Sequence, residues 1–358
     1  MISQLPLSLS QSPKNLDRVN LQPFYEYLHP AWKPIQPRHH RDNNNNNNNN
    51  NNDNITNLRI TTWNIDFQTP AKTPRTAAAL NYLSQTIPTA PPSILLLQEM
   101  IASDLDLIKQ TPWIQTNFNI TDLSPTDWQG TYGTTMLIDK RLPVQRVFRV
   151  PYSATRMQRD ALFVDIAISA TEPSSSPGNT NPTANAPILR VGTTHLESLL
   201  SNPPIRPVQL RLAAGFMHGG GRADERDEVV LPVPHAAILA GDLNAFAPED
   251  LTAPGECGLR DAFLVLGGQD GEEESFTWGQ QVPVWMKEQF GCSRMDKVLF
   301  CGGLEVKTLR RIGEGETVWI DYPREASDLG DDDDESSRGE RVWVTDHLGL
   351  EADFEVIS

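Results

Sequence analysis

The sequence has few cysteines and no long apolar run, and these two shortages exclude several protein classes. Only three cysteines occur, Cys257, Cys292 and Cys301, and no two of them form a Cys-x-x-Cys pair. A disulfide framework and a thiolate zinc site are therefore not predicted, and a reducing compartment is expected. The longest run of Leu, Ile and Val, Ile94 to Leu97, is far too short to cross a membrane, and the N-terminus lacks the pattern of a secretory signal. We expect neither membrane segments nor secretion.

Positive charge is also scarce. The 358 residues include 30 Lys and Arg against 46 Asp and Glu, which gives a net charge of −16. A chain this acidic does not bind nucleic acid by covering it with charge, so any such contact must be local. Part of the deficit lies between Asp321 and Glu340, where nine acidic residues accompany two arginines. With 38% hydrophobic and 21% charged residues, the chain as a whole is typical of a folded protein.

The first 57 residues differ in composition from the rest of the chain. They are rich in Ser, Pro and Asn and include an unbroken asparagine tract at 43–52, which buries too little apolar surface to offset chain entropy. We expect residues 1–57 to be a disordered segment in which only the aromatic cluster Phe24, Tyr25, Tyr27 and Trp32 docks on the following domain. Residues 58–358 are predicted to form one catalytic domain, with surface-loop insertions at 171–187 and 331–335.

Beyond residue 58, short runs of β-branched and aliphatic residues greatly outnumber helical segments. Strands are expected at 59–63, 93–98, 131–138, 144–150, 161–168, 188–194, 236–240, 294–300 and 341–344. Helices are expected at 75–86 and 207–217. Many strands with few helices favour two packed, mixed or mainly antiparallel sheets with helices outside, an α/β fold, over a doubly wound parallel sheet.

Polar side chains follow the predicted strands at the points where the strands end. The segments are Trp63-Asn64-Ile65-Asp66, Gln98-Glu99, His195-Leu196-Glu197-Ser198, Gly241-Asp242-Leu243-Asn244 and Thr345-Asp346-His347. In two packed sheets, such strand ends form the rim of one pocket. Glu99 is informative even alone, because a carboxylate at the end of a buried strand costs free energy unless a cation or hydrogen-bond donors compensate it.

These residue types favour the hydrolysis of a phosphate ester. Asp66 and Glu99 are hard oxygen ligands in a set without cysteine, which suits Mg²⁺, with Mn²⁺ as a second option, better than zinc. Asparagines and histidines can donate hydrogen bonds to phosphate oxygens, and Asp242 can take a proton from water. Taken singly, a Gly-Asp-Leu-Asn segment is more often a turn and a lone histidine is more often structural. Their joint occurrence favours an active site.

Six motifs resemble, in this order, those of the endonuclease/exonuclease/phosphatase superfamily. They are Thr62-Trp63-Asn64, Leu97-Gln98-Glu99, His195-Leu196-Glu197-Ser198, Gly241-Asp242-Leu243-Asn244, Ser293-Arg294-Met295-Asp296 and Thr345-Asp346-His347. The segments at 63–66 and 195–198 look most like those of the tyrosyl-DNA phosphodiesterases that act on 5′ ends. The resemblance covers about residue 58 to the C-terminus and implies the DNase I-like fold, a four-layer α/β sandwich.

The resemblance also implies a role for each matching residue. Glu99 looks like the metal-binding glutamate, with Asp66 assisting directly or through water. Asp242 resembles the general base or acid, and Asn244 would orient the nucleophilic water and the phosphate.

Further residues are implied to act on the phosphate and on the DNA strand. His195 and His347 would hold phosphate oxygens, with Asp296 fixing the ring of His347 and Asp346 orienting its neighbours. The remaining implied contacts are Asn64 and Ser198 to the phosphate or its metal shell, and Tyr132, Trp278, Met295 and Arg206 to single-stranded 5′ DNA.

Two loops depart from the family pattern. After Asn244 come Ala245-Phe246-Ala247, where an Arg-Asp pair is common, and after Ser198 come Leu199-Leu200 in place of a Thr-Arg pair. The second change removes one expected cation, so the substrate contacts of these loops stay open.

The implied activity is an Mg²⁺-dependent phosphodiesterase that removes a tyrosyl peptide from the 5′ end of DNA. Its substrate would be the lesion left by a trapped type II topoisomerase, its product a 5′ phosphate, and its location the nucleus, with the cytoplasm as a second location. One alternative is a phosphoesterase of the same fold that acts on another nucleic acid, a lipid or a soluble phosphate ester. Another is a non-catalytic binding module, which predicts loss of Glu99, Asp242 or His347, yet all three are present.

Overall fold

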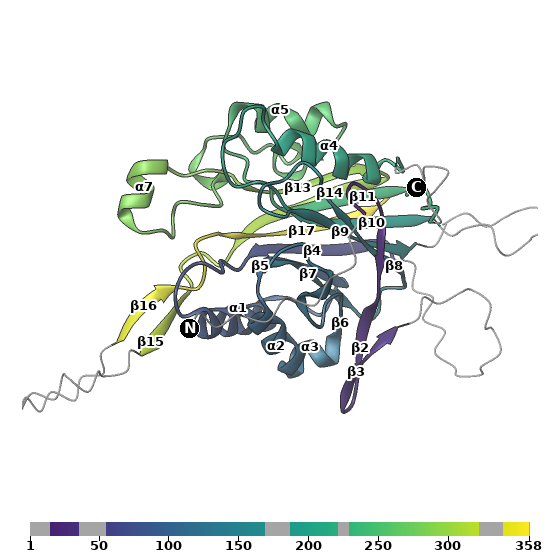
Figure 1. Cartoon of the computed structure of the whole chain (residues 1–358), viewed down its shortest axis with the longest axis horizontal. Helices are drawn as coiled ribbons and strands as arrows, with labels where there is room; N and C mark the ends of the chain where they lie inside the picture. Colours follow the sequence, from purple (N-terminus) through teal and green to yellow (C-terminus); the bar gives the residue numbers. More distant parts are fainter. Residues whose placement is uncertain (1–14, 36–54, 169–186, 221–228, 322–338, 358) are drawn as a thin grey trace, which may run out of the picture.

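Two large β-sheets form the centre of the molecule (Figure 1). The structure, a computed structural model, describes residues 15–35, 55–168, 187–220, 229–321 and 339–357. Sheet A has the strand order β1-β8-β9-β10-β11-β13-β12, and sheet B has the order β14-β17-β4-β5-β7-β6-β2-β3. The pairs β10·β11 and β4·β5 are parallel, whereas the other strand pairs in the described ranges are antiparallel. Both sheets are therefore mixed, as predicted.

The strand bounds are as follows. Sheet A contains β1 (Asn20–Gln22), β8 (Val144–Pro151), β9 (Asp160–Ala167), β10 (Ile188–His195), β11 (Ala236–Asp242), β12 (Arg260–Asp261) and β13 (Asp296–Gly302). Sheet B contains β2 (Phe24–Leu28), β3 (Ala31–Ile35), β4 (Asn57–Asn64), β5 (Ser93–Met100), β6 (Phe118–Ile120), β7 (Gly133–Asp139), β14 (Leu304–Ile312) and β17 (Gly349–Val356). A separate two-stranded ribbon consists of β15 (Thr317–Asp321) and β16 (Gly339–Trp343).

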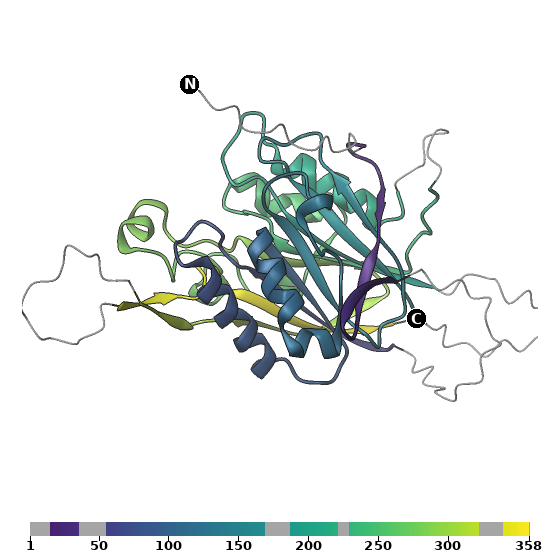
Figure 2. The same ribbon diagram turned by 60° about the horizontal axis from the view of Figure 1, so that its bottom comes forward.

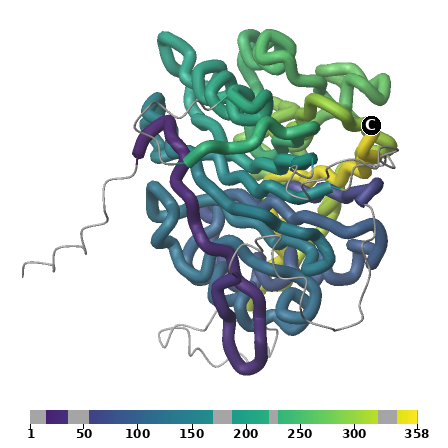
Figure 3. Tube along the Cα trace, turned by 90° about the vertical axis from the view of Figure 1, so that its right-hand side faces the viewer, coloured from purple at the N-terminus to yellow at the C-terminus, as the bar shows by residue number. Residues whose placement is uncertain are grey.

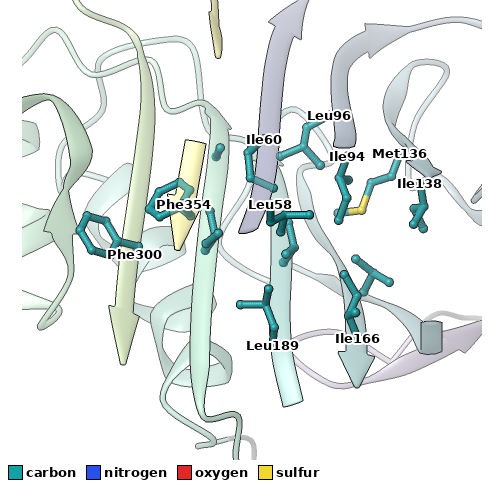
Figure 4. Packing of buried hydrophobic residues seen from close by; sticks show 14 of the residues in the cluster. Leu58, Ile60, Ile94, Leu96, Met136, Ile138, Ile166, Leu189, Phe300 and Phe354 are labelled. Carbon is teal, nitrogen blue, oxygen red and sulfur yellow. The ribbon is translucent and has the colours of Figure 1, made fainter. Parts of the chain in front are cut away.

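The largest hydrophobic cluster lies between the two sheets. Leu58, Ile60, Ile94 and Leu96 of sheet B are fully buried in one cluster with residues of sheet A such as Leu189 (Figure 4). Alternate residues of each strand point to this layer, as expected when each sheet buries one face against the other. The two sheets are thus held together by an apolar layer that contains no site residue.

Helices cover the outer face of each sheet (Figures 1 and 2). They are α1 (Lys72–Thr86), α2 (Ala102–Gln110) and α3 (Pro112–Asn117) on sheet B, and α4 (Arg206–Met217) and α5 (Pro248–Glu256) on sheet A, with the short α6 (Ala262–Val265) and α7 (Val284–Phe290) in later loops. The layers are helix, sheet, sheet, helix, which confirms the predicted four-layer α/β sandwich. In the described residues, no helix is long and apolar enough to cross a membrane.

The strands and helices predicted from the sequence are present, with bounds that differ by a few residues. Several others were not predicted, among them β14 and β17. These two strands interleave charged and apolar residues along their length, and β14 lies at the edge of sheet B. The insertions at 171–187 and 331–335 lie almost wholly outside the described residues, as does the asparagine tract.

The expectation that residues 1–57 are disordered is wrong for residues 15–35. This segment, named the N-terminal strap, adds β1 to the edge of sheet A beside β8 and β2–β3 to the edge of sheet B beside β6 (Figure 3). Phe24 is buried in the layer between the sheets, and Tyr25 and Trp32 pack on the α1 to α3 side. The aromatic cluster therefore docks on the domain as predicted, because burying these rings offsets the cost of ordering the strap.

Candidate active site

The strand register of sheet A aligns three site residues side by side. His195 ends β10 and is the register partner of Asp242, which ends β11. Asp242 is in turn the register partner of Asp296, the first residue of β13. Neighbouring strands are about 5 Å apart, so one row of backbone hydrogen bonds fixes the spacing of these side chains.

Sheet B places its site residues with irregular backbone. Asn64 at the end of β4 pairs in register with Gln98, and the next residue, Glu99, lies where the β5·β7 register shifts between Leu97 and Met100. Glu99 has a φ of 58°, in the left-handed region that side chains rarely adopt. A β-bulge of this kind turns a side chain away from the regular alternation, and here it presents the glutamate to the site. Backbone strain of this kind is common at functional sites.

Asp242 lies at the centre of the site. Its Oδ2 accepts a hydrogen bond from Asn64 Nδ2 at 2.9 Å and lies 3.3 Å from His195 Nε2 and 3.7 Å from His347 Nε2. Its Oδ1 accepts from the backbone N–H of Asn244 at 2.8 Å. Burial, followed by the nearby Asp296, raises the pKa of Asp242, while the His347 imidazolium opposes that rise. The structure thus brings together five predicted residues that are far apart in the sequence: Asn64, His195, Asp242, Asp296 and His347.

His347 is held in its charged form. Its Nδ1 lies 2.8 Å from Asp296 Oδ2, which is the contact that the sequence predicted. Burial alone lowers the pKa of His347, but the carboxylates of Asp296, Asp242 and Asp346 outweigh burial and hold that pKa well above its usual value. The ring therefore presents a positive charge to the site at neutral pH.

His195 is held in the neutral form by a residue that sequence reasoning missed. Arg159 Nη1 lies 2.9 Å from His195 Nδ1, and because a guanidinium can only donate, this nitrogen accepts and the proton sits on Nε2. Burial, with the nearby Arg159, lowers the pKa of His195 well below its usual value. Arg159 also donates to Ser198 Oγ at 2.8 Å and lies over the ring of Tyr132 at 5.1 Å. Tyr132, in turn, stacks on Phe67.

Glu99 and Asp242 fit the requirements of a divalent cation. Carboxylate oxygens of Glu99 and Asp242 lie within 4.8 Å of each other and of a ring nitrogen of His195. The two carboxylates can therefore hold the cation, whereas His195 borders it as a donor. Burial raises the pKa of Glu99 to about 7, and the neighbouring Asp346 and Asp242 carboxylates add to that rise while His347 opposes it. Several buried carboxylates at such short range repel one another, and a bound cation relieves this repulsion. The residues present thus fit the predicted metal.

Asp66, predicted to assist the metal, has other partners. Its Oδ2 accepts from Arg75 Nη2 at 2.6 Å, and its Oδ1 accepts from the backbone N–H groups of Gln68 and Thr69. Burial raises the pKa of Asp66, but Arg75 and Thr69 outweigh burial and lower it. The structure therefore places Asp66 in an ion pair beside the site and leaves Glu99 as the sheet B carboxylate at its centre.

Two predicted substrate residues lie beside Asp346. Trp278 Nε1 donates to Asp346 Oδ2 at 3.0 Å, and Trp278 forms a β-bridge with His347. Met295 packs with Trp278, Val282 and Met286 in a small apolar cluster, and Trp278 also contacts the ring of Phe290 in α7. Asp346 therefore orients Trp278, so a small and largely buried apolar cluster begins directly beside His347.

Arg206, predicted to contact the DNA strand, is buried and paired in this structure. Its guanidinium forms an ion pair with Asp250, donates to the carbonyls of Glu197 and Leu199, and lies over the ring of Phe246 at 4.3 Å. A buried and fully engaged guanidinium positions the loops around it and is not presented to a substrate phosphate. Its Pro-rich surroundings in the sequence did not reveal the ion pair, which depends on a carboxylate 44 residues away.

Comparison with known proteins agrees with this geometry. Residues 198–347 match the model of the Endonuclease/Exonuclease/phosphatase family. No curated protein sequence matches the chain.

The solved structures that are similar in fold include three of TDP2. Zebrafish TDP2 humanized by 14 mutations is 18% identical, with a TM-score of 0.57 over 84% of this chain and 99% of that chain. Zebrafish TDP2 complexed with a single-strand DNA product is 17% identical, with a TM-score of 0.55 over 84% and 99% of the two chains. Selenomethionine TDP2 from Caenorhabditis elegans is 20% identical, with a TM-score of 0.55 over 84% and 74%.

These likenesses establish the DNase I-like fold that the six sequence motifs implied. The predicted resemblance to the endonuclease/exonuclease/phosphatase superfamily is confirmed, because residues 198–347 match the family model and the chain shares its fold with the TDP2 structures.

Proposed function

We propose that this protein hydrolyses the bond between a tyrosyl side chain and the 5′ phosphate of DNA, and so repairs ends left by topoisomerase II. The observation that carries the proposal is the meeting of two segments in one pocket. Asn64 from sheet B and His195 from sheet A both reach Asp242, and they belong to the segments at 63–66 and 195–198 that most resemble the tyrosyl-DNA phosphodiesterases. The similarity in fold to TDP2 structures, one of them with single-strand DNA, supports the same substrate.

In this proposal Asp242 takes the proton of the attacking water. Its Oδ2 faces the pocket, and the side-chain amide of Asn64 holds that carboxylate in place at 2.9 Å. Its raised pKa makes it a stronger base than an exposed aspartate. Asn244, whose φ of 46° lies in the left-handed region, turns its amide toward Ser198 and the carbonyl of Leu196. The water attacks phosphorus in line with the departing tyrosyl oxygen.

Two histidines with different charge states stabilise the phosphate. His347 is an imidazolium fixed by Asp296, and His195 is a neutral donor through Nε2 because Arg159 occupies its other nitrogen. Both groups are fixed before the substrate arrives, so they add little reorganisation cost when charge develops on the phosphate oxygens. Arg159 adds a fixed positive charge behind His195 and Ser198.

We propose Mg²⁺ as the cofactor, held by Glu99 with Asp242 nearby. When bound, the cation withdraws charge from the phosphate and makes phosphorus more reactive. The proposed DNA contacts are the ring of Tyr132 and the apolar cluster of Trp278 and Met295, which suit bases because stacking is indifferent to sequence. This substrate places the proposed activity in the nucleus.

The test is the release of tyrosine from a single-stranded oligonucleotide with a 5′-phosphotyrosyl end. We expect release with Mg²⁺, none with a chelator, and none from a Glu99→Ala variant whose circular dichroism matches that of the wild type. Hydrolysis of a generic phosphodiester without tyrosine release would keep the catalytic residues but move the substrate to another nucleic acid, a lipid or a soluble phosphate ester. No hydrolysis of either substrate would overturn the proposal.

A further inference from the structure

An exposed apolar surface borders the pocket on the side of Asp242 and Asn244. It consists of Leu199, Leu200 and Phe246, and we call it the apolar rim. The residues are 65%, 67% and 37% exposed, and an exposed apolar patch is informative where a single exposed leucine is not. Leu199 directly follows Ser198, and Phe246 lies two residues after Asn244, so the rim is continuous with the residues that hold the phosphate.

The two loops that carry the rim contain no basic residue. There is no Lys, Arg or His from Leu196 to Ile205, nor from Leu243 to Leu259. The cation nearest in sequence, Arg206, is 4% exposed and paired with Asp250. A nucleic-acid strand that crosses these loops therefore meets apolar side chains where a phosphate-binding surface would carry positive charge.

Arg206 holds the rim in place. It donates to the carbonyl oxygen of Leu199 at 3.2 Å and lies under the ring of Phe246 at 4.3 Å, so one guanidinium joins the loop after β10 to the loop after β11. Asp250 fixes the guanidinium from α5 with three contacts of 2.8 to 3.0 Å. The buried ion pair between Arg206 and Asp250 therefore holds the ring of Phe246 and the loop of Leu199 in fixed positions.

The chemistry of the reaction decides which part of the substrate reaches this side. In an in-line displacement the attacking water and the leaving group lie on opposite sides of phosphorus. Asp242 activates the water, and the rim extends from the same side of the pocket, through Ser198 and Asn244. The bond from phosphorus to the retained strand lies in the plane between water and leaving group, with the phosphate oxygens that Ser198 and Asn244 are expected to hold. The rim beside these two residues therefore lies next to the strand that remains and off the axis of the departing tyrosyl group.

We infer that the apolar rim binds the unpaired bases of the retained DNA strand, and that this protein recognises its strand more through bases than through backbone charge. The inference rests on the proposed function for the direction of the strand. Apolar and aromatic side chains bind bases without sequence preference, because every base has a stacking face. A chain with a net charge of −16 gains from such contacts, since they do not need a basic surface.

The test measures binding of a 5′-phosphorylated single-stranded oligonucleotide, the product, at several salt concentrations. For the wild type we expect a shallow dependence of log Kd on log salt and a loss of affinity when the first bases are replaced by abasic sites. Phe246→Ala should weaken binding of the normal strand by about 5- to 100-fold and the abasic strand far less. Leu200→Arg should steepen the salt slope by about 0.7, the increment of one added cation on single strands.

Leu28→Ala serves as the matched control, because Leu28 is 53% exposed on β2, a strand that supplies no site residue. A steep salt slope in the wild type, or equal binding of normal and abasic strands, would overturn the inference. So would a Phe246→Ala variant that is folded by its melting temperature and binds both strands as the wild type does. These binding assays use the product and need no turnover. Their result can therefore be told apart from a failure of the tyrosine-release assay, which tests the proposed function.

Discussion

Sheet A and sheet B contribute different chemistry to the same pocket. In sheet A, Asp296 and Asp242 each face a histidine, so these carboxylates and rings form acid–base pairs at 2.8 and 3.3 Å. In sheet B, Glu99 accepts a hydrogen bond from the backbone of Phe67 and has no Lys or Arg in ion-pair contact among the described residues. A buried carboxylate without a cationic side-chain partner is the one that gains most from a metal.

The comparison indicates that the two sheets have different roles in the proposed reaction. In the proposed mechanism, proton handling belongs to the regular strand ends of sheet A, whose side chains are aligned by register, and the charged His347 reaches them from the segment before β17. Metal binding belongs to the bulged end of β5, where the backbone is irregular. Replacing a site residue of sheet A should therefore affect proton transfer, whereas replacing Glu99 of sheet B should affect metal binding.

The largest effect is expected from Asp242→Asn in sheet A. Loss of the proton acceptor should lower the single-turnover rate by about 10³-fold or more, since general base catalysis alone contributes about 10² to 10⁴. Binding of the product oligonucleotide should change little, because the amide keeps the shape of the carboxylate. Rapid-quench measurement of the rate checks this, and a wild-type rate would remove Asp242 from the proton transfer.

Asp296→Asn should have the next largest effect and should alter the pH profile. The Asp296 carboxylate is among the groups that hold the pKa of His347 above its usual value, so removing it lowers that pKa and the imidazolium loses its proton at lower pH. We expect kcat to fall by about 10²-fold and the alkaline limb of kcat/KM to move to lower pH. An unmoved limb between pH 6 and 9.5 would show that His347 does not act as the charged group.

The sheet B carboxylate is best tested by the stability of the metal-free protein. The pKa of Glu99 rises from 4.5 in the unfolded chain to about 7 in the fold, so the folded state binds more protons between these values. Stability therefore falls as the pH rises from 4.5 through 7, by roughly 3 kcal/mol in total. With chelator present, the melting temperature of the wild type should decrease between pH 6 and 8 relative to that of Glu99→Gln. Equal pH dependence in both proteins would contradict the placement of Glu99.

The smallest effect on catalysis is expected at the N-terminal strap, which contributes neither to proton handling nor to metal binding. Phe24→Ala removes a ring that is 3% exposed and should lower the free energy of unfolding by about 3 kcal/mol. Deletion of residues 1–35 should lower the melting temperature by several degrees. A deletion of 1–35 that melts like the full chain would show that the strap adds no stability.

The strand ends of the site could be predicted because they are local patterns. An apolar run followed by Asp or His is visible in the sequence, and register then brings Asp242 and Asp296 together. Arg159 could not be found in this way, since its contacts join it to His195, 36 residues away. Arg206 was predicted to contact the DNA strand because the sequence does not show that its partner Asp250, on another helix, engages its guanidinium. The strands of the strap were missed because they are short and lie in a segment whose overall composition is dominated by Ser, Pro and Asn, although its aromatic cluster was predicted to dock.

The strap also affects the tendency of the protein to aggregate. By pairing with β8, β1 covers backbone groups at an edge of sheet A, and β2–β3 extend sheet B in the same way. Uncovered edges of this kind invite strand pairing between copies and so promote aggregation. A shortened chain that begins after residue 35 would expose both edges, so the first sign of a missing strap is expected in light scattering, before any loss of catalytic rate.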